Sequence, residues 1–165
     1  MRQVPGTRIA ELGPGTGIVT REIAASLSPV ARALAIDLDP VFVARLQDAV
    51  PQVECVCGSA ASLAVLADAR GLLPLDHVVS GLPFASLPVS ATDLILRAIV
   101  ATLRPGGTFT TFQYIHAYGF PAAVAFRGRM TRLMEADPAV STVIANLPPA
   151  FVLTWRRAGE PVKVG

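Results

Sequence analysis

Short apolar runs alternate along this chain with longer segments in which apolar residues recur at helical spacing. A continuous run such as Ala33 to Ile36 predicts a strand that is buried on both faces. From Ile18 onward, apolar residues recur three to five positions apart, which predicts a helix. The pattern predicts strands near 7–11, 32–37, 53–57, 75–80 and 107–114, and helices near 18–28, 40–50, 61–69 and 89–103.

This alternation predicts an α/β fold, because strands separated by helices form right-handed crossover units in a mostly parallel sheet. In such a sheet ligands bind at the carboxyl edge. Pro40 suits a first helical position, and Arg104-Pro105-Gly106-Gly107 predicts a turn that ends the preceding helix. After Tyr114 the regular alternation of predicted strands and helices ends. There we expect a helix over 121–135 and a hairpin of strands Ala139–Ala145 and Phe151–Trp155, joined through Asn146-Leu147-Pro148-Pro149.

Composition favours one domain over 1–165, with 52% hydrophobic and only 16% charged residues. No apolar run reaches the roughly 18 residues of a membrane-spanning helix, and the first residues do not resemble a signal peptide. We therefore expect a cytoplasmic or membrane-peripheral protein. The net charge is +2, so binding of nucleic acid would need a local basic cluster.

The two cysteines, Cys55 and Cys57, lie two apart on a predicted strand, so their side chains share one face. They lack the spacing of a zinc site. We expect buried free thiols and no bound metal.

Glu11-Leu12-Gly13-Pro14-Gly15-Thr16-Gly17 lies where the first strand passes into the first helix. Glycine tolerates positive φ and lets a ligand approach the backbone, while the helix start offers unpaired N–H groups. A dinucleotide-binding loop has its third glycine one residue later, and an acid beside a pyrophosphate is unfavourable. The segment resembles the E/D-x-G-x-G-x-G loop of S-adenosylmethionine-dependent methyltransferases. The alternative is a glycine-rich turn without a ligand.

Acidic and polar residues end the first three strands. Asp37 is placed to accept the hydroxyl hydrogens of a ribose; helix capping is the alternative, and it suits Asp39 better. Glu11 can attract the methionyl amine or the sulfonium, or else bond nearby backbone N–H groups. Ser59 either replaces the adenine-binding aspartate of many relatives or begins a helix. The predicted cofactor-binding residues are Glu11, Gly13, Gly15, Thr16, Gly17, Asp37, Leu38, Gly58, Ser59, Ala60 and Ser80.

The fourth strand runs into Ser80-Gly81-Leu82-Pro83-Phe84, which resembles the N-P-P-Y and N-L-P-Y loops of amino-methyltransferases. Carbonyls near Gly81 and Leu82 can hold the hydrogens of an amine, and the Phe84 face can stabilise its positive charge. Serine in place of asparagine argues against a planar nucleobase amine and leaves room for an aliphatic one. The alternative is an ordinary turn.

Two further groups of residues are candidates for contact with an acceptor. Tyr114, His116 and Tyr118 follow the fifth strand and can accept a proton or enclose a methylated ammonium. Alternatively, His116 is an ordinary loop residue and the two tyrosines pack at the rim of the site. Arg127, Arg129 and Arg132 lie within six positions, among apolar residues that can meet acyl chains. They can bind a lipid phosphate, form a solvated helix face, or contact an RNA backbone, for which three residues are few.

Four motifs together resemble the small soluble phosphatidylethanolamine N-methyltransferases of bacteria, relatives of the ribosomal RNA adenine dimethylases. They are the glycine loop, Val79-Ser80-Gly81-Leu82-Pro83-Phe84, Leu103-Arg104-Pro105-Gly106-Gly107 and Asn146-Leu147-Pro148-Pro149-Ala150. The resemblance implies a Rossmann-like sheet of seven strands, the last antiparallel, and three methyl transfers from S-adenosylmethionine that yield phosphatidylcholine.

The resemblance also implies a monomer at the inner face of an anionic membrane. It further implies an amphipathic helical segment before the glycine loop, which we expect to be missing because the loop begins within the first dozen residues. An adenine N6-methyltransferase acting on RNA, and a cofactor-binding module without activity, remain as alternatives.

Overall fold

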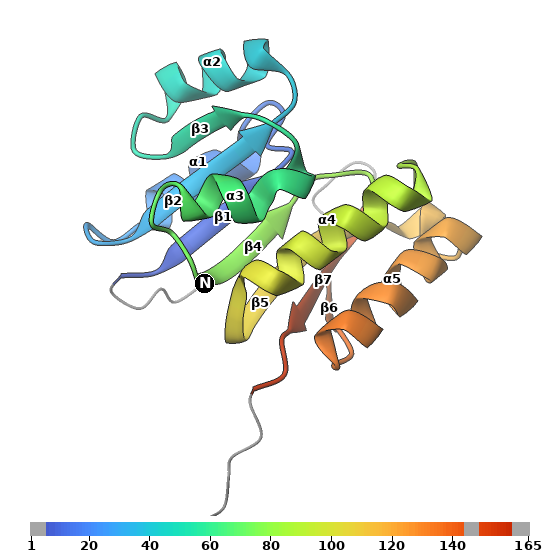
Figure 1. The fold of residues 1–165 in the computed structure, drawn as a ribbon. Coiled ribbons are helices and arrows are strands. Elements are labelled where there is room, and N and C mark those ends of the chain that lie inside the picture. The colour runs from blue at the N-terminus through green and yellow to red at the C-terminus, as the bar shows by residue number, and fades with distance from the viewer. Residues whose placement is uncertain (1–5, 144–148, 160–165) are drawn as a thin grey trace, which may run out of the picture.

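The computed structural model describes residues 6–143 and 149–159, which form a seven-stranded sheet with helices on both faces (Figure 1). The strand order is β3-β2-β1-β4-β5-β7-β6. The strands are β1 (Arg8–Leu12), β2 (Arg32–Asp37), β3 (Glu54–Cys57), β4 (Leu75–Ser80), β5 (Leu103–Tyr114), β6 (Ala139–Val143) and β7 (Ala150–Arg156). The helices are α1 (Ile18–Ser26), α2 (Pro40–Ala49), α3 (Leu63–Asp68), α4 (Val89–Thr102) and α5 (Pro121–Met134), with short 3-10 turns η1 (Ala60–Ser62) and η2 (Ile115–Ala117).

The predicted α/β class and seven-stranded sheet are confirmed. Strands β1 to β5 pair in parallel, whereas β7 pairs antiparallel with both β5 and β6. The predicted helix over 61–69 is divided into η1 and α3. The end of the predicted strand at residues 144–145 and the joining residues 146–148 lie outside the described part of the chain.

Residues 104–107 depart from the prediction, because they lie within β5 rather than forming a turn ahead of it. Helix α4 ends before them, at Thr102. Leu103 pairs with Leu75 and Thr108 pairs with His77, so β5 carries extra residues that shift its register against β4. Extra residues in one strand of a pair are accommodated as a bulge, in which a glycine takes the left-handed conformation. Gly106 supplies that conformation at φ 74°.

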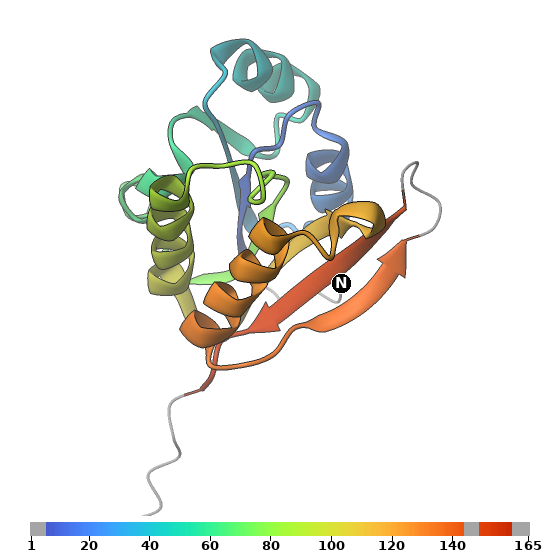
Figure 2. The same ribbon diagram turned by 90° about the vertical axis from the view of Figure 1, so that its right-hand side faces the viewer.

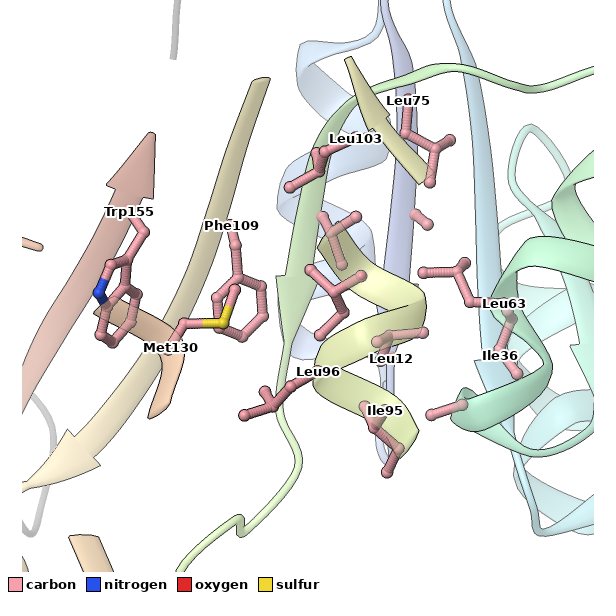
Figure 3. Close-up of a cluster of buried hydrophobic side chains, with 14 of the residues drawn as sticks. Leu12, Ile36, Leu63, Leu75, Ile95, Leu96, Leu103, Phe109, Met130 and Trp155 are labelled. Atoms are coloured by element: carbon pink, nitrogen blue, oxygen red, sulfur yellow. The ribbon is translucent and has the colours of Figure 1, made fainter. Parts of the chain in front are cut away.

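The core lies on both faces of the sheet. On one face, Phe109 and Trp155 stack at 5.8 Å between ring centroids and pack with Met130 of α5 and with α3 and α4 (Figure 3). On the other face a smaller cluster joins Ile9 and Leu46 beneath α1 and α2. Each fully buried large side chain stabilises the fold by about 1.5–3 kcal/mol, so the sheet is held rigidly and fixes the positions of the loops at its carboxyl edge.

The prediction of buried cysteines is wrong. Cys55 is half-buried and Cys57 is exposed, because β3 is an edge strand of the sheet. Both thiols are free.

Across residues 6–143 and 149–159, none of the helices combines the length and the apolar character that crossing a membrane requires.

Candidate active site

The glycine loop between β1 and α1 has three residues in the left-handed conformation. Gly13, Gly15 and Gly17 have φ values of 67°, 52° and 77°. A Cβ at Gly13 would lie 2.6 Å from the Leu82 side chain, and one at Gly17 would collide with Leu46, whereas one at Gly15 would meet nothing within 4 Å. Gly13 and Gly17 therefore allow close packing, and Gly15 leaves space in which a ligand can lie against the backbone.

Glu11 lies in β1 directly before this loop and is 3% exposed. Its Oε2 atom has no hydrogen-bond partner within the described residues. Burial raises the pKa of Glu11 to about 7; the Thr20 hydroxyl of α1, close by but outside strict hydrogen-bond geometry, opposes the rise, and the Asp37 carboxylate adds to it. A buried carboxyl group without a partner is costly unless a cation or donor is bound, so Glu11 is suited to meet a positively charged ligand.

The two acids at the end of β2 have separate roles. Asp39 accepts a hydrogen bond from the Val41 N–H at 2.8 Å and caps α2, which confirms the assignment of the cap. Asp37 accepts the Gly15 N–H at 3.2 Å and the Asp39 N–H at 3.0 Å. The Asp37 carboxylate therefore lies beside the open glycine of the loop, where a ribose hydroxyl can reach it.

Residues after β3 lie at the same edge of the sheet. The Gly58 N–H donates to the Asp37 carbonyl at 2.8 Å. The Ser59 hydroxyl accepts the Ala61 N–H at 3.2 Å and caps η1, which favours the capping interpretation of Ser59. Its own proton remains available to a ligand, since a hydroxyl can donate and accept together. Thr16 and Leu38 are exposed near this edge, whereas Ala60 is buried.

The loop after β4 contacts the glycine loop through backbone atoms. The Gly81 N–H donates to the Leu12 carbonyl at 2.9 Å, and a Cβ at Gly81 would lie 2.6 Å from the Gly13 carbonyl oxygen. The Ser80 hydroxyl accepts the Leu82 N–H at 3.2 Å, so this buried side chain stabilises the turn. The two loops that sequence reasoning linked to the cofactor and the acceptor are therefore in direct contact.

An apolar cavity of about 330 Å³ lies beside this contact. It is lined by Gly81, Leu82, Pro83, Phe84, Ala85, Ser86, Phe112, Gln113, Tyr114, Ala117, Ala123 and Phe126. Four of the predicted acceptor residues line it, namely Gly81, Leu82, Phe84 and Tyr114, whereas Ser80, His116 and Tyr118 do not.

Aromatic side chains in this region divide into packing and exposed groups. Phe84 is buried and stacks on Phe126 at 4.5 Å between centroids, so most of its surface is used in packing. Tyr114 is 40% exposed, lies edge to face with Phe112 at 5.6 Å, and is parallel to His116 at 5.7 Å. Phe112 was missed in the sequence, although its position two residues before Tyr114 on one strand places both side chains on the same face.

The three arginines of α5 do not converge. Arg127 donates to the Gln113 side chain at 2.7 Å and to the Tyr118 carbonyl at 2.8 Å, and its guanidinium lies 3.7 Å from the Tyr118 ring centroid. Arg129 lies 3.5 Å from the Asp93 carboxylate of α4, and Arg132 is exposed in the last turn. Arg127 therefore projects from a different side of α5 than the other two, whereas Arg129 and Arg132, three residues apart, lie on the same side.

Comparison with known proteins identifies the family. The methyltransferase domain family matches residues 9–107, which run from β1 into β5. The chain belongs to this family. The prediction of S-adenosylmethionine as the cofactor is thereby confirmed. The space at Gly15 and the Oε2 atom of Glu11, which no described residue bonds, fit such a ligand.

Individual relatives agree with this fold. The ornithine lipid N-methyltransferase of Singulisphaera acidiphila is 34% identical over 104 residues, which cover 61% of this chain and 54% of the relative, so the match spans about half of that protein. A TehB-like S-adenosylmethionine-dependent methyltransferase from Corynebacterium glutamicum superposes with a TM-score of 0.69 at 15% identity, covering 94% of this chain and 82% of that one. The N-methyltransferase NodS from Bradyrhizobium japonicum, in complex with S-adenosyl-L-homocysteine, gives 0.67 at 15% identity, with 92% and 78% covered.

Proposed function

We propose that this chain methylates the primary amine of a membrane lipid, with phosphatidylethanolamine as the acceptor and phosphatidylcholine as the product of three transfers. The supporting observation is the apolar cavity beside the contact between Gly81 and Gly13. The 34% identity to an ornithine lipid N-methyltransferase supports a lipid amine as acceptor.

The cofactor would be held at the carboxyl edge of β1 and β2. S-adenosylmethionine supplies a methyl group on a positively charged sulfur. The backbone at Gly15 would lie against it, the Glu11 carboxylate would attract its positive charge, and Asp37 would accept its ribose hydroxyls.

The loop after β4 and the exposed rings would hold the acceptor amine. Carbonyls of Gly81 and Leu82 would accept the amine hydrogens, and the Leu82 carbonyl is already oriented by the Phe84 N–H at 3.0 Å. Methyl transfer needs alignment and exclusion of water more than acid catalysis, which an apolar cavity provides. An ammonium with a pKa of roughly 10 must first lose its proton. His116, which stacks on Tyr114 and lies outside the lining of the cavity, would take that proton through water.

Labelled methyl transfer tests the proposal. The chain would be incubated with methyl-labelled S-adenosylmethionine and vesicles that contain phosphatidylethanolamine, and the lipid products would be separated. We expect label in the mono-, di- and trimethylated lipids and none with phosphatidylcholine vesicles. Transfer of label only to vesicles in which ornithine lipid takes the place of phosphatidylethanolamine would replace the proposed acceptor. A folded protein that binds cofactor but labels no lipid amine would contradict the proposal.

Replacement of Tyr114 tests the aromatic wall. We expect Tyr114→Leu to lower kcat/KM for the third methyl transfer, whose product carries a permanent positive charge, about twofold to 30-fold. A cation over an aromatic face gains about 0.5–2 kcal/mol. Tyr114→Phe keeps the ring and serves as the control. Retained activity in Tyr114→Phe would assign the effect to the ring, whereas equal losses in both variants would assign it to the phenol and contradict the cation–π role.

A further inference from the structure

A second pocket, of about 180 Å³, opens between α1 and α2 next to the glycine loop. It is lined by Gly15, Thr16, Arg21, Phe42, Arg45 and Leu46. Its volume is about six times the roughly 30 Å³ that one water occupies in the liquid, which leaves room for a phosphate group. The proposed transfer assigns no role to its two arginines.

Both arginines are available to an anion. Arg21 is held at the pocket by a hydrogen bond from its guanidinium to the Thr16 carbonyl at 3.1 Å. Arg45 is exposed, and its side chain has neither a hydrogen bond nor an ion pair among residues 6–143 and 149–159. The carboxylates of Asp37 and Asp39 lie nearby and accept backbone N–H groups. The lining of the pocket itself holds two arginines and no carboxylate.

Exposed aliphatic side chains lie at the same edge of the sheet as the pocket. Ile18 begins α1, Leu38 follows β2, and Val41 lies in the first turn of α2; they are 70%, 73% and 54% exposed. Further along this edge, Tyr114 and Ile115 at the end of β5 are also exposed. Exposed aliphatic residues beside arginines are typical of a surface that enters the headgroup region of a bilayer.

We propose that the pocket between α1 and α2 binds the phosphate of an anionic phospholipid headgroup and docks the carboxyl edge of the sheet on a membrane. Arg21 and Arg45 would bind the phosphate, and Ile18 and Val41 would lie against the acyl boundary. This inference deepens the proposed function, on which it rests because a lipid acceptor requires contact with a membrane. The docked edge is also the edge at which the acceptor cavity opens beside the glycine loop.

Co-flotation with vesicles tests the docking surface without any measurement of methyl transfer. Vesicles of phosphatidylcholine alone would be compared with vesicles of equal parts phosphatidylcholine and phosphatidylglycerol. We expect Arg45→Gln to weaken binding to the anionic vesicles about fivefold, and Arg21→Gln with Arg45→Gln about 30-fold, since each arginine near an anionic surface contributes about 1 kcal/mol. Ile18→Ser and Val41→Ser should weaken binding to both kinds of vesicle.

Arg97→Gln is the matched control, because Arg97 is exposed on α4, on the opposite face of the sheet (Figure 2). It should bind vesicles as the unaltered chain does. Equal losses in Arg97→Gln and Arg45→Gln, or no loss in the double variant, would overturn the proposal. A matching loss of S-adenosylhomocysteine affinity in Arg45→Gln would assign the pocket to the cofactor instead. Competition by inorganic phosphate at the concentration of lipid phosphate would assign it to a free anion. Vesicle binding without methyl transfer would refute only the proposed function.

Discussion

Gly81→Ala is expected to lower kcat/KM at least about 100-fold and to weaken cofactor binding. The added Cβ would lie 2.6 Å from the Gly13 carbonyl oxygen, which is a backbone atom that moves only if the glycine loop moves. Displacement of a positioning group by about 1 Å costs on the order of 100-fold in rate. Cofactor affinity would be measured by calorimetry with S-adenosylhomocysteine, and the rate by transfer of label to lipid vesicles.

Gly128→Ala is the control for this substitution. Gly128 lies within α5, where a Cβ would meet nothing within 4 Å, so alanine should fit and increase the free energy of unfolding by about 0.5–1 kcal/mol. Its cofactor affinity should be unchanged. Normal affinity and rate in a folded Gly81→Ala variant would mean that the contact between the two loops is not required.

Glu11→Gln is expected to weaken S-adenosylmethionine binding by roughly 10-fold to 100-fold. Glu11 is buried, its Oε2 atom has no partner among the described residues, and a charged hydrogen bond or ion pair contributes about 1.5–3 kcal/mol. A parallel titration with S-adenosylhomocysteine, which lacks the sulfonium charge, shows which part of the cofactor Glu11 attracts. A larger loss for S-adenosylmethionine would indicate attraction to sulfur, and equal losses would indicate attraction to the amine. Unchanged affinity for both ligands would contradict a role for Glu11 in binding.

The same carboxyl group predicts opposite pH dependences for binding and for stability. Its pKa of about 7 lies above the usual value of 4.5 for a glutamate side chain, so the folded chain holds this proton more tightly than the unfolded chain. Protonation of Glu11 therefore stabilises the folded chain. Its contribution to the free energy of unfolding is fully present below about pH 4.5 and is lost as the pH rises through 7, by up to about 3 kcal/mol. A cationic ligand needs the ionised form, so its affinity should rise over the same range. Urea unfolding and cofactor titration at pH 5.5 and pH 8 would check both trends, and Glu11→Gln should remove them.

Local sequence by itself determined the order of the elements and the chemistry of the cofactor edge. Apolar periodicity depends only on near neighbours, so it predicted β2 and the helices before and after it, α1 and α2. The left-handed glycines and the cap at Asp39 are also local, since each is fixed by backbone conformation within a few residues.

Tertiary structure alone decided which side chains meet across elements. Phe84 was predicted to face an ammonium; it lines the cavity, and Phe126 of α5, distant in sequence, stacks on it. Arg127 is bound to β5 and Arg129 to α4, whereas Arg21 and Arg45, which are far apart in the sequence, line one pocket. The partner of a side chain depends on how helices cross the sheet and on competition among all groups within reach, and neither is encoded in local periodicity.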